Sequence, residues 1–394
     1  MMKEPRKIVL ILGNGFDLDL GLNTLYKNFW ESKYCPKNYP APLIRHLNEH
    51  WPENLEKVRW YDLENELLNY YHILQSGHRR FEIVSSEELR FIQSVSPESI
   101  AHSIPSRFLE QARSLMEKGL LTIEYNPGRQ YVIPYHEDFS KTTVWRDRKA
   151  LGLIKEGLCK FLKKIHRSAS ETQTVASQVL NSVLRCEDKG DFVNVYTFNY
   201  TPVYSAGQSL NESIVHYMHG NCNEGRIIIG TRDDLEMNRD YDFLQKVMDP
   251  SFSPPDLVTA LEGADEVIIF GHSLGENDRQ YFAPFFLRQA SDSTVLKKSI
   301  TIFTKNHESV IEIKRALQKM TGGKLSALFS INQPVIIRTG EIEADQKAMY
   351  NFLDKHNIDK HHAAEIIGKL INRERENKAG TLKDYTSANN AESS

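Results

Sequence analysis

The first candidate ligand-binding segment is a glycine turn near the start of the chain, made of Gly13, Asn14, Gly15, Phe16 and Asp17. Its two glycines allow positive φ and a close backbone approach, and the helix start that follows offers backbone N–H groups to an anion such as a pyrophosphate. The turn departs from the dinucleotide fingerprint because Leu18 stands at the third glycine position, and no Walker-type Gly-Lys-Ser/Thr follows. It predicts a phosphate-binding turn, with an ordinary tight turn as the alternative.

An amide and an imidazole in the middle of the chain are the next candidates. Asn199 can donate and accept hydrogen bonds at once, which suits holding a ribose hydroxyl or a water, although an Asn can also cap its own turn. His216 and His219 lack a third ligand at readable spacing, so we expect no metal site. One of the two suits a general base, because imidazole changes charge near neutral pH, and a structural histidine is the alternative.

A second polar loop, at 271–278, contributes Gly271, His272, Ser273 and Asp278. Its first five residues fit the Gly-x-Ser-x-Gly pattern of a hydrolase nucleophile elbow, in which Ser273 would attack. A nucleophile elbow also needs an Asp or Glu followed by a His further along the chain, and an oxyanion loop. The sequence shows no recognisable set of these features. We therefore favour a second nucleotide-contacting loop.

These segments need a scaffold that brings them together, and the hydrophobic pattern predicts one. Residues 7–12 form a continuous apolar run typical of a strand buried on both faces of a parallel sheet. Similar strands alternate with helical segments, which predicts an α/β fold: an open, mostly parallel Rossmann-like sheet with helices on both faces. The polar loops follow strands, at the edge where such sheets bind ligands. Further strands are expected at 192–198, 227–229, 266–270, 299–303 and 334–337, and helices at 22–32, 52–75, 151–185, 279–291 and 307–320.

The segment 85–148 differs in character from the chain around it. The segment contains two predicted helix starts, then a helix that ends at Gly119, then a predicted hairpin around 126–128. This is the order of elements in a winged helix. Between 97 and 148, seven Lys/Arg are balanced by seven Asp/Glu, so the basic surface of a DNA reader is missing and a structural or docking role is favoured. We expect a Rossmann-like domain over 1–84 and 149–372, this insert, and a flexible tail over 373–394.

The composition is that of an ordinary globular protein, with 394 residues and a net charge of -3. This balance provides no electrostatic drive toward nucleic acid or anionic membrane, and no apolar run reaches the roughly 20 residues of a membrane-spanning helix. The N-terminus lacks the order of a signal peptide, so we expect a cytoplasmic protein. Four scattered cysteines indicate neither a disulfide framework nor a zinc site.

Several blocks of sequence carry more information together than the single motifs do. The longest spans 12–29 and begins Leu-Gly-Asn-Gly-Phe-Asp, and shorter ones are Trp-Tyr-Asp-Leu-Glu at 60–64, Phe-Asn-Tyr at 198–200, His-Gly at 219–220 and Gly-His-Ser-Leu-Gly-Glu-Asn-Asp at 271–278. With these blocks the chain resembles the bacteriophage abortive infection AbiH family. The likeness covers most of the chain in pieces and leaves out 85–148.

More distantly, the same landmarks in the same order resemble the sirtuin-like NAD-binding fold. That resemblance implies that the turn at Gly13 lies against NAD, that Asn199 holds the nicotinamide ribose or the attacking water, and that His219 is the base. It places the loop from Gly271 against the adenosine half. The chain lacks the paired zinc cysteines of sirtuin deacetylases, which argues against deacetylation, and Thr201 stands where sirtuins commonly carry Asp.

We expect an antiphage effector that binds NAD, as substrate or ligand, and hydrolyses its nicotinamide–ribose bond without a metal. This bond breaks through an oxocarbenium-like ribose, which needs a base and a polar group near the ribose or the water. The alternatives are a nucleotide-sensing or partner-binding defence protein without turnover and, more weakly, a serine hydrolase that uses Ser273. The sequence does not determine the trigger, which could be phage-derived or a partner protein. It also leaves the assembly state open, including a homo-oligomer. Neither nucleic acid nor a membrane is an expected partner.

Overall fold

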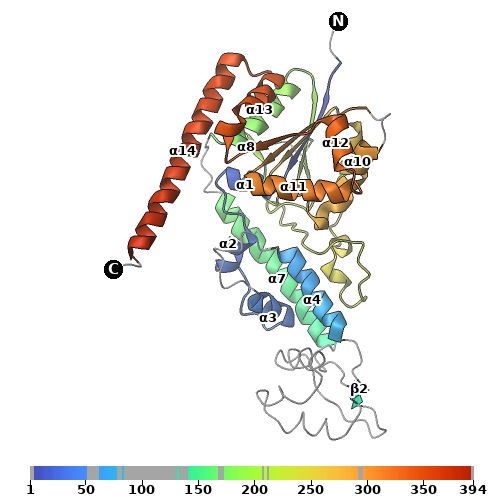
Figure 1. Ribbon diagram of the computed structural model, residues 1–394. Coiled ribbons are helices and arrows are strands. Elements are labelled where there is room, and N and C mark those ends of the chain that lie inside the picture. Colours follow the sequence, from blue (N-terminus) through green and yellow to red (C-terminus); the bar gives the residue numbers. More distant parts are fainter. Residues whose placement is uncertain are drawn as a thin grey trace. The chain divides into compact units, whose positions relative to one another are not determined.

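The computed structural model describes residues 4–50, 62–77, 82–83, 131–132, 141–166, 173–205, 208–210, 213–291 and 296–391. The chain folds into two compact units (Figure 1). The sheet unit comprises 1–34, 158–228 and 250–394, and the helical unit comprises 35–157 and 229–249. Within the described ranges, no helix combines the length and the apolar character needed to cross a membrane.

The sheet unit is built on one six-stranded sheet in which every neighbouring pair of strands is parallel. Counted along the chain and taken from one edge, its strands follow the order 3-2-1-4-5-6, which is the order of a doubly wound nucleotide-binding fold. The predicted Rossmann-like architecture is confirmed. From that edge the strands are β7 (Val215–Tyr217), β4 (Phe192–Thr197), β1 (Lys7–Leu12), β8 (Glu266–Phe270), β9 (Ser299–Thr304) and β10 (Val335–Arg338).

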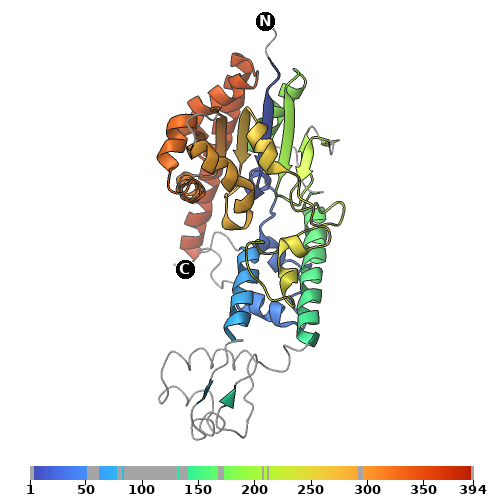
Figure 2. The same cartoon turned by 90° about the vertical axis from the view of Figure 1, so that its right-hand side faces the viewer.

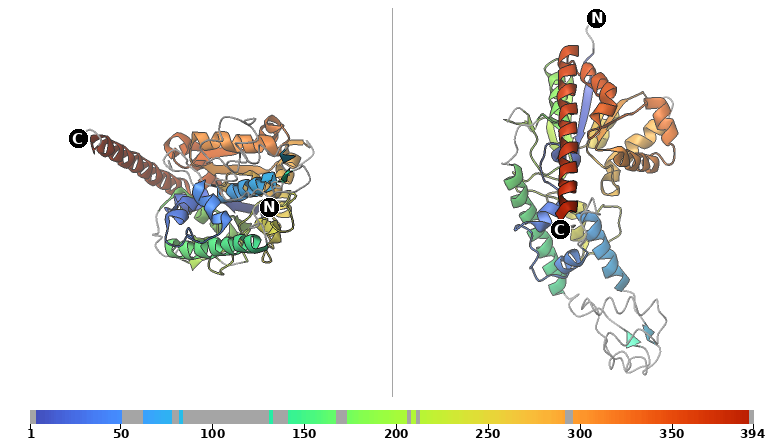
Figure 3. Two further views of the ribbon diagram at one scale, coloured as in Figure 1. Left: turned by 90° about the horizontal axis from the view of Figure 1, so that it is seen from below. Right: turned by 60° about the vertical axis from the view of Figure 1, so that its left-hand side comes forward.

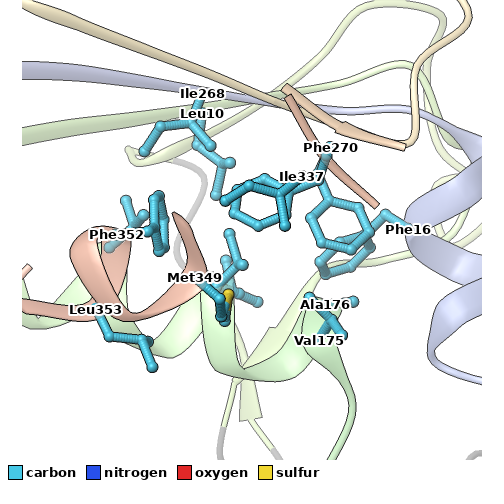
Figure 4. Close-up of a cluster of buried hydrophobic side chains, with 14 of the residues drawn as sticks. Leu10, Phe16, Val175, Ala176, Ile268, Phe270, Ile337, Met349, Phe352 and Leu353 are labelled. Carbon is cyan, nitrogen blue, oxygen red and sulfur yellow. The ribbon is translucent and has the colours of Figure 1, made fainter. Parts of the chain in front are cut away.

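Helices cover both faces of this sheet (Figure 2). Successive side chains of a strand point to opposite faces, so Leu10 of β1 joins one core while Val9 and Ile11 join the other. The first core is closed by α8 and α13, which contribute labelled side chains in Figure 4, and by α14; the second is closed by α9, α10, α11 and α12. These helices are α8 (Val175–Glu187), α9 (Leu257–Gly263), α10 (Arg279–Ser291), α11 (His307–Met320), α12 (Leu325–Asn332), α13 (Ile342–Lys355) and α14 (Lys360–Ala391).

The sheet unit also contains short elements around its loops. A six-residue helix, α1, follows β1 directly, and a short 3-10 turn, η5, precedes α10. The hairpin of β5 and β6 is antiparallel. The bounds are α1 (Asn14–Asp19), α2 (Tyr26–Glu31), β5 (Tyr204–Ser205), β6 (Gln208–Ser209) and η5 (Glu276–Asp278).

The helical unit is organised around one buried carboxylate, Asp147. Its oxygens accept hydrogen bonds from Tyr70 Oη at 2.5 Å, from Tyr241 Oη at 3.2 Å and from the backbone N of Leu43 at 3.0 Å. Burial raises the pKa of Asp147 to about 6, although these hydrogen bonds oppose the rise. The surrounding elements are α3 (Pro42–Glu49), α4 (Leu63–Gly77), α7 (Lys141–His166), whose last turns belong to the sheet unit, η3 (Asp242–Leu244) and η4 (Lys246–Met248).

Most of the strands lie where the sequence predicts them, with one exception and one omission. The stretch 227–229 is not a strand; there the backbone N of Ile228 donates to the carbonyl oxygen of His219 at 3.0 Å. The edge strand β7 was not predicted, because it has three residues and a polar His216 at its centre. Helices α10 and α11 match their predicted ranges, whereas the helix expected over 151–185 consists of α7 and α8.

The predicted insert at 85–148 lies outside the described residues except for 131–132 and 141–148. β3 (Tyr131–Val132) pairs antiparallel with β2 (Glu82–Ile83), and residue 148 falls inside α7. The segment from 373, predicted as a flexible tail, is helical as far as Ala391, where the long red α14 ends (Figure 3).

Candidate functional site

Four neighbouring strands end at one edge of the sheet and each continues into one of the polar segments. Their last paired residues are in register: Tyr217 of β7 lies opposite Thr197 of β4, Thr197 opposite Leu12 of β1, and Leu12 opposite Phe270 of β8. His219, Asn199, the Gly13 turn and the Gly271 loop follow these residues within two positions. The chain order of the strands reverses between β1 and β8, which is where ligands of doubly wound sheets bind.

The glycine turn after β1 packs against the loop after β8 through backbone alone. Gly13 N donates to the carbonyl oxygen of Phe270 and Gly15 N to that of Gly271, each at 2.9 Å. A Cβ at Gly13 would lie 2.5 Å from the Cα of His272, and one at Gly15 would lie 2.6 Å from the Cα of Gly271. The close approach that the sequence suggested for a phosphate is therefore made by the second loop.

Asn199 holds the glycine turn from the side of β4. Its Nδ2 donates to the carbonyl oxygen of Gly13 and to Oδ1 of Asp17, both at 3.0 Å. Thr201 Oγ1 donates to the other carboxylate oxygen of Asp17 at 2.5 Å. Both amide donors of Asn199 are thus engaged within the protein, so a contact with ribose or water would use its Oδ1.

Asp17 is the buried centre of this cluster, with 4% of its surface exposed. Burial raises the pKa of Asp17 to about 7, and the hydrogen bonds from Thr201 and Asn199 only partly oppose that rise. The carboxyl group therefore titrates near neutral pH. Sequence reasoning placed Asp17 in the turn but did not foresee that Asn199 and Thr201 would both donate to it.

The imidazoles of His219 and His272 meet at one carboxylate. His219 Nε2 lies 3.4 Å from Oδ1 of Asp278, and His272 Nε2 lies 3.5 Å from Oδ2. The backbone N of Leu274, a residue with φ +54°, donates to Nδ1 of His272 at 2.9 Å. In neutral His272 the ring proton is therefore on Nε2 and faces Asp278.

Aromatic side chains surround the two imidazoles. The ring centroid of Phe198 lies 5.4 Å from that of His219 and 4.3 Å from that of His272, and Tyr281 lies 6.3 Å from His219. An apolar surrounding weakens solvent screening, so the attraction between an imidazolium and Asp278 is stronger here than in water. Asp278, predicted to bind a cofactor, lies within ion-pair distance of both imidazoles.

His216 points to different partners. Its Nε2 lies 3.1 Å from Oδ1 of Asn194, and its ring packs on Tyr196 at 4.7 Å between centroids. Burial lowers the pKa of His216 below its usual value. Of the two histidines that the sequence proposed as a base, His219 is therefore the one that meets Asp278.

The geometry disfavours Ser273 as a nucleophile. A nucleophile elbow holds its Ser on a strained turn, whereas the positive φ values here fall at Gly271 and Leu274. The Ser273 side chain is exposed, and the Nε2 atoms of His219 and His272 both face Asp278. Across the part of the chain that the structure describes, no group of three or more His, Cys, Asp or Glu side chains is arranged to hold a metal ion.

Comparison with known proteins adds one finding to this geometry. Residues 9–298 match the family model described as bacteriophage abortive infection AbiH, and this range contains every candidate residue named above. Comparisons with curated proteins and with solved structures gave no match. The chain belongs to the bacteriophage abortive infection AbiH family, which suggests a role in antiphage abortive infection.

Proposed function

We propose that this protein is an abortive-infection effector that binds NAD at the carboxyl edge of β1 and β8 and hydrolyses the nicotinamide–ribose bond. The observation that carries the proposal is the His219–Asp278 pair beside the point where the strand order reverses. An imidazole oriented by a carboxylate is an arrangement that suits general-base catalysis.

The reaction consumes one water and one NAD and gives nicotinamide, ADP-ribose and a proton. As the bond from the anomeric carbon to the nicotinamide nitrogen breaks, positive charge develops on the ribose, and water attacks the same carbon. His219 accepts the proton of this water, and Asp278 stabilises the imidazolium that forms. The ring of Phe198 excludes bulk water from one side of His219.

A second candidate function is nucleotide sensing without turnover. It is favoured by the internal use of the polar groups beside the glycine turn, because both amide donors of Asn199 and both carboxylate oxygens of Asp17 are already hydrogen-bonded. In that case NAD would change the arrangement of these loops and would dissociate without being cleaved.

The test follows nicotinamide release from NAD by the purified full-length chain, alone and with lysate of phage-infected cells. His219→Asn should reduce release about 100-fold and Asp278→Asn at least tenfold, since a positioned base contributes about that much. His216→Asn is the matched control, because His216 contacts Asn194 and Tyr196, and it should stay within twofold of the parent.

NAD binding by calorimetry, measured in parallel, separates the two candidates. Saturable binding without release under either condition supports the sensing function and overturns hydrolysis. If the chain neither binds NAD nor releases nicotinamide, both candidate functions are overturned. If the parent and His219→Asn release nicotinamide equally, His219 is not the base.

A further inference from the structure

The sheet unit has a cavity on the outer side of α8, away from the residues of the candidate site. Its volume is about 210 Å³, and it lies between α8 and the start of α14, two helices that also close the same core (Figure 1). One water occupies about 30 Å³ in the liquid, so this space holds a group the size of a phosphate with several waters, but it is small for a dinucleotide.

The lining of the cavity is cationic and rich in hydrogen-bond donors. Arg185 contributes a guanidinium from α8 and Lys369 an ammonium from α14, whereas His362 of α14 lies 3.6 Å from Glu365, Nδ1 to Oε2. Neither Asp nor Glu is among the described residues that line it, although the whole chain carries a net charge of -3. Glu365, which does not line the cavity, offsets the charge of Lys369, so it is the guanidinium of Arg185 that favours an anion in this concave, polar space.

The neighbouring side chains suit an oxyanion rather than a halide. The amide side chains of Gln178 and Asn181 line the cavity beside Arg185, and they add N–H donors to the planar guanidinium fork, which matches phosphate geometry. Glu365 pairs with Lys369, Nζ to Oε1 at 2.7 Å, which holds the ammonium on this face of α14. Ile358 and Ile366 contribute apolar surface to the same lining.

We propose that this cavity is a second, separate ligand site of the protein and that it binds a phosphate group, either free phosphate or the phosphate of a small phosphoester. The site shares no residue with the His219–Asp278 site, so it does not depend on the function proposed above.

The experiment titrates inorganic phosphate into the full chain at constant ionic strength, with sodium chloride as the balancing salt, and follows binding by calorimetry and the midpoint of thermal unfolding. We expect saturable binding that Arg185→Gln weakens at least tenfold. Lys369→Gln should weaken it several-fold, and Arg185→Lys should recover only part of the affinity because it keeps the charge but loses the fork. Lys189→Gln, which removes an exposed charge just after α8, is the matched control and should stay within twofold.

Ribose 5-phosphate and AMP serve to identify the source of the phosphate group. If either binds at least tenfold more tightly than inorganic phosphate, and Arg185→Gln removes the gain, the ligand is a phosphoester; equal affinities indicate free phosphate. His219→Asn should leave all of these affinities unchanged. The proposal is wrong if phosphate does not bind saturably, if Lys189→Gln and Arg185→Gln lose affinity equally, or if His219→Asn loses as much as Arg185→Gln.

Discussion

The side chain with the largest consequence for pH dependence is Asp17. Its carboxyl is buried, accepts hydrogen bonds from Asn199 and Thr201, and has a pKa raised by burial to about 7. In the unfolded chain an Asp titrates near 3.9, so the folded state binds the proton more tightly than the unfolded state between these two values. The free energy of unfolding therefore falls as the pH rises from about 4 to about 7, by up to about 4 kcal/mol from this group.

The first prediction concerns Asp17→Asn, which cannot ionise. Relative to the parent, this variant should be more stable at pH 8 than at pH 4.5, because only the parent loses stability as Asp17 ionises. Urea unfolding at several pH values measures the difference, and subtracting the two curves removes the contribution of Asp147, which has the same sign.

Asp345→Asn provides the contrasting control. Burial tends to raise the pKa of Asp345, but hydrogen bonds from Arg338 outweigh it and the pKa is lowered overall. This carboxylate stabilises the fold above pH 4, so its variant should lose stability relative to the parent as the pH rises. If Asp17→Asn behaves in the same way, the raised pKa of Asp17 is incorrect.

A second prediction concerns the contact between the two glycine loops. Gly13→Ala should destabilise the protein by about 1–3 kcal/mol. The new Cβ would overlap the Cα of His272, so the backbone of one of the two loops would have to shift. Gly368→Ala in α14 is the control: nothing lies within 4 Å of its added Cβ, and Ala favours a helix by about 1 kcal/mol. Opposite shifts in the unfolding midpoint are expected, and equal shifts would refute the packing argument.

At the scale of the elements, the start of α8 is stabilised both by its local sequence and by a tertiary contact. Thr174 and Ser177 form a reciprocal capping box, with Thr174 Oγ1 accepting from Ser177 N at 3.1 Å. The backbone donor one residue earlier, Ala176 N, is satisfied from α1 by Asp19 Oδ2 at 2.7 Å. The start of α8 is thereby tied to the segment that carries the glycine turn.

The third prediction follows from this cap. Thr174→Ala should lower the free energy of unfolding by about 1 kcal/mol, and Thr174→Ser should keep most of it because the hydroxyl remains. Chemical denaturation measures both variants. Equal losses would mean that the Thr174 methyl group, rather than the hydrogen bond, stabilises this end of α8.

The sheet positions the candidate site because four of its strands end together. Gly13, Asn199 and His219 each follow the last paired residue of their strand by one or two positions. Their relative placement therefore depends on the register of β1, β4 and β7. A one-residue slip in register would turn the side chains of a strand to the opposite face. The short β7 makes the placement of His219 depend on its backbone pairing with β4, for which the sequence gives no strong pattern.

At the scale of the whole molecule, the two proposed ligands should leave separate footprints. Hydrogen exchange with NAD should protect backbone amides at 12–17, 198–201, 217–219 and 271–278, whereas phosphate should protect those near 181–185 and 362–369. Mass-spectrometric exchange of the full chain measures both. Protection of the same peptides by both ligands would contradict the assignment of two sites.

The sequence alone located five of the six strands of the main sheet and some of its helices, but not α12, α13 or α14. Buried strands such as 266–270 and helices such as 279–291 are visible in it because periodicity and apolar runs are local properties of the chain. It also located the polar loops at strand ends, since these directly follow the apolar runs. It failed where a strand was short and polar, at β7, and where an apolar run at 227–229 pairs with a loop instead of a strand.

Only the tertiary structure decided which side chains meet. Asp17 is more than 180 residues from Asn199 and Thr201, and nothing in local sequence pairs it with them. The same holds for His219 and Asp278, and for Gly13 and Gly15, whose missing side chains admit the backbone of a loop from a distant part of the chain. Strand order and register set these contacts, and both depend on the cooperative packing of the whole sheet unit, which no segment of the chain specifies by itself.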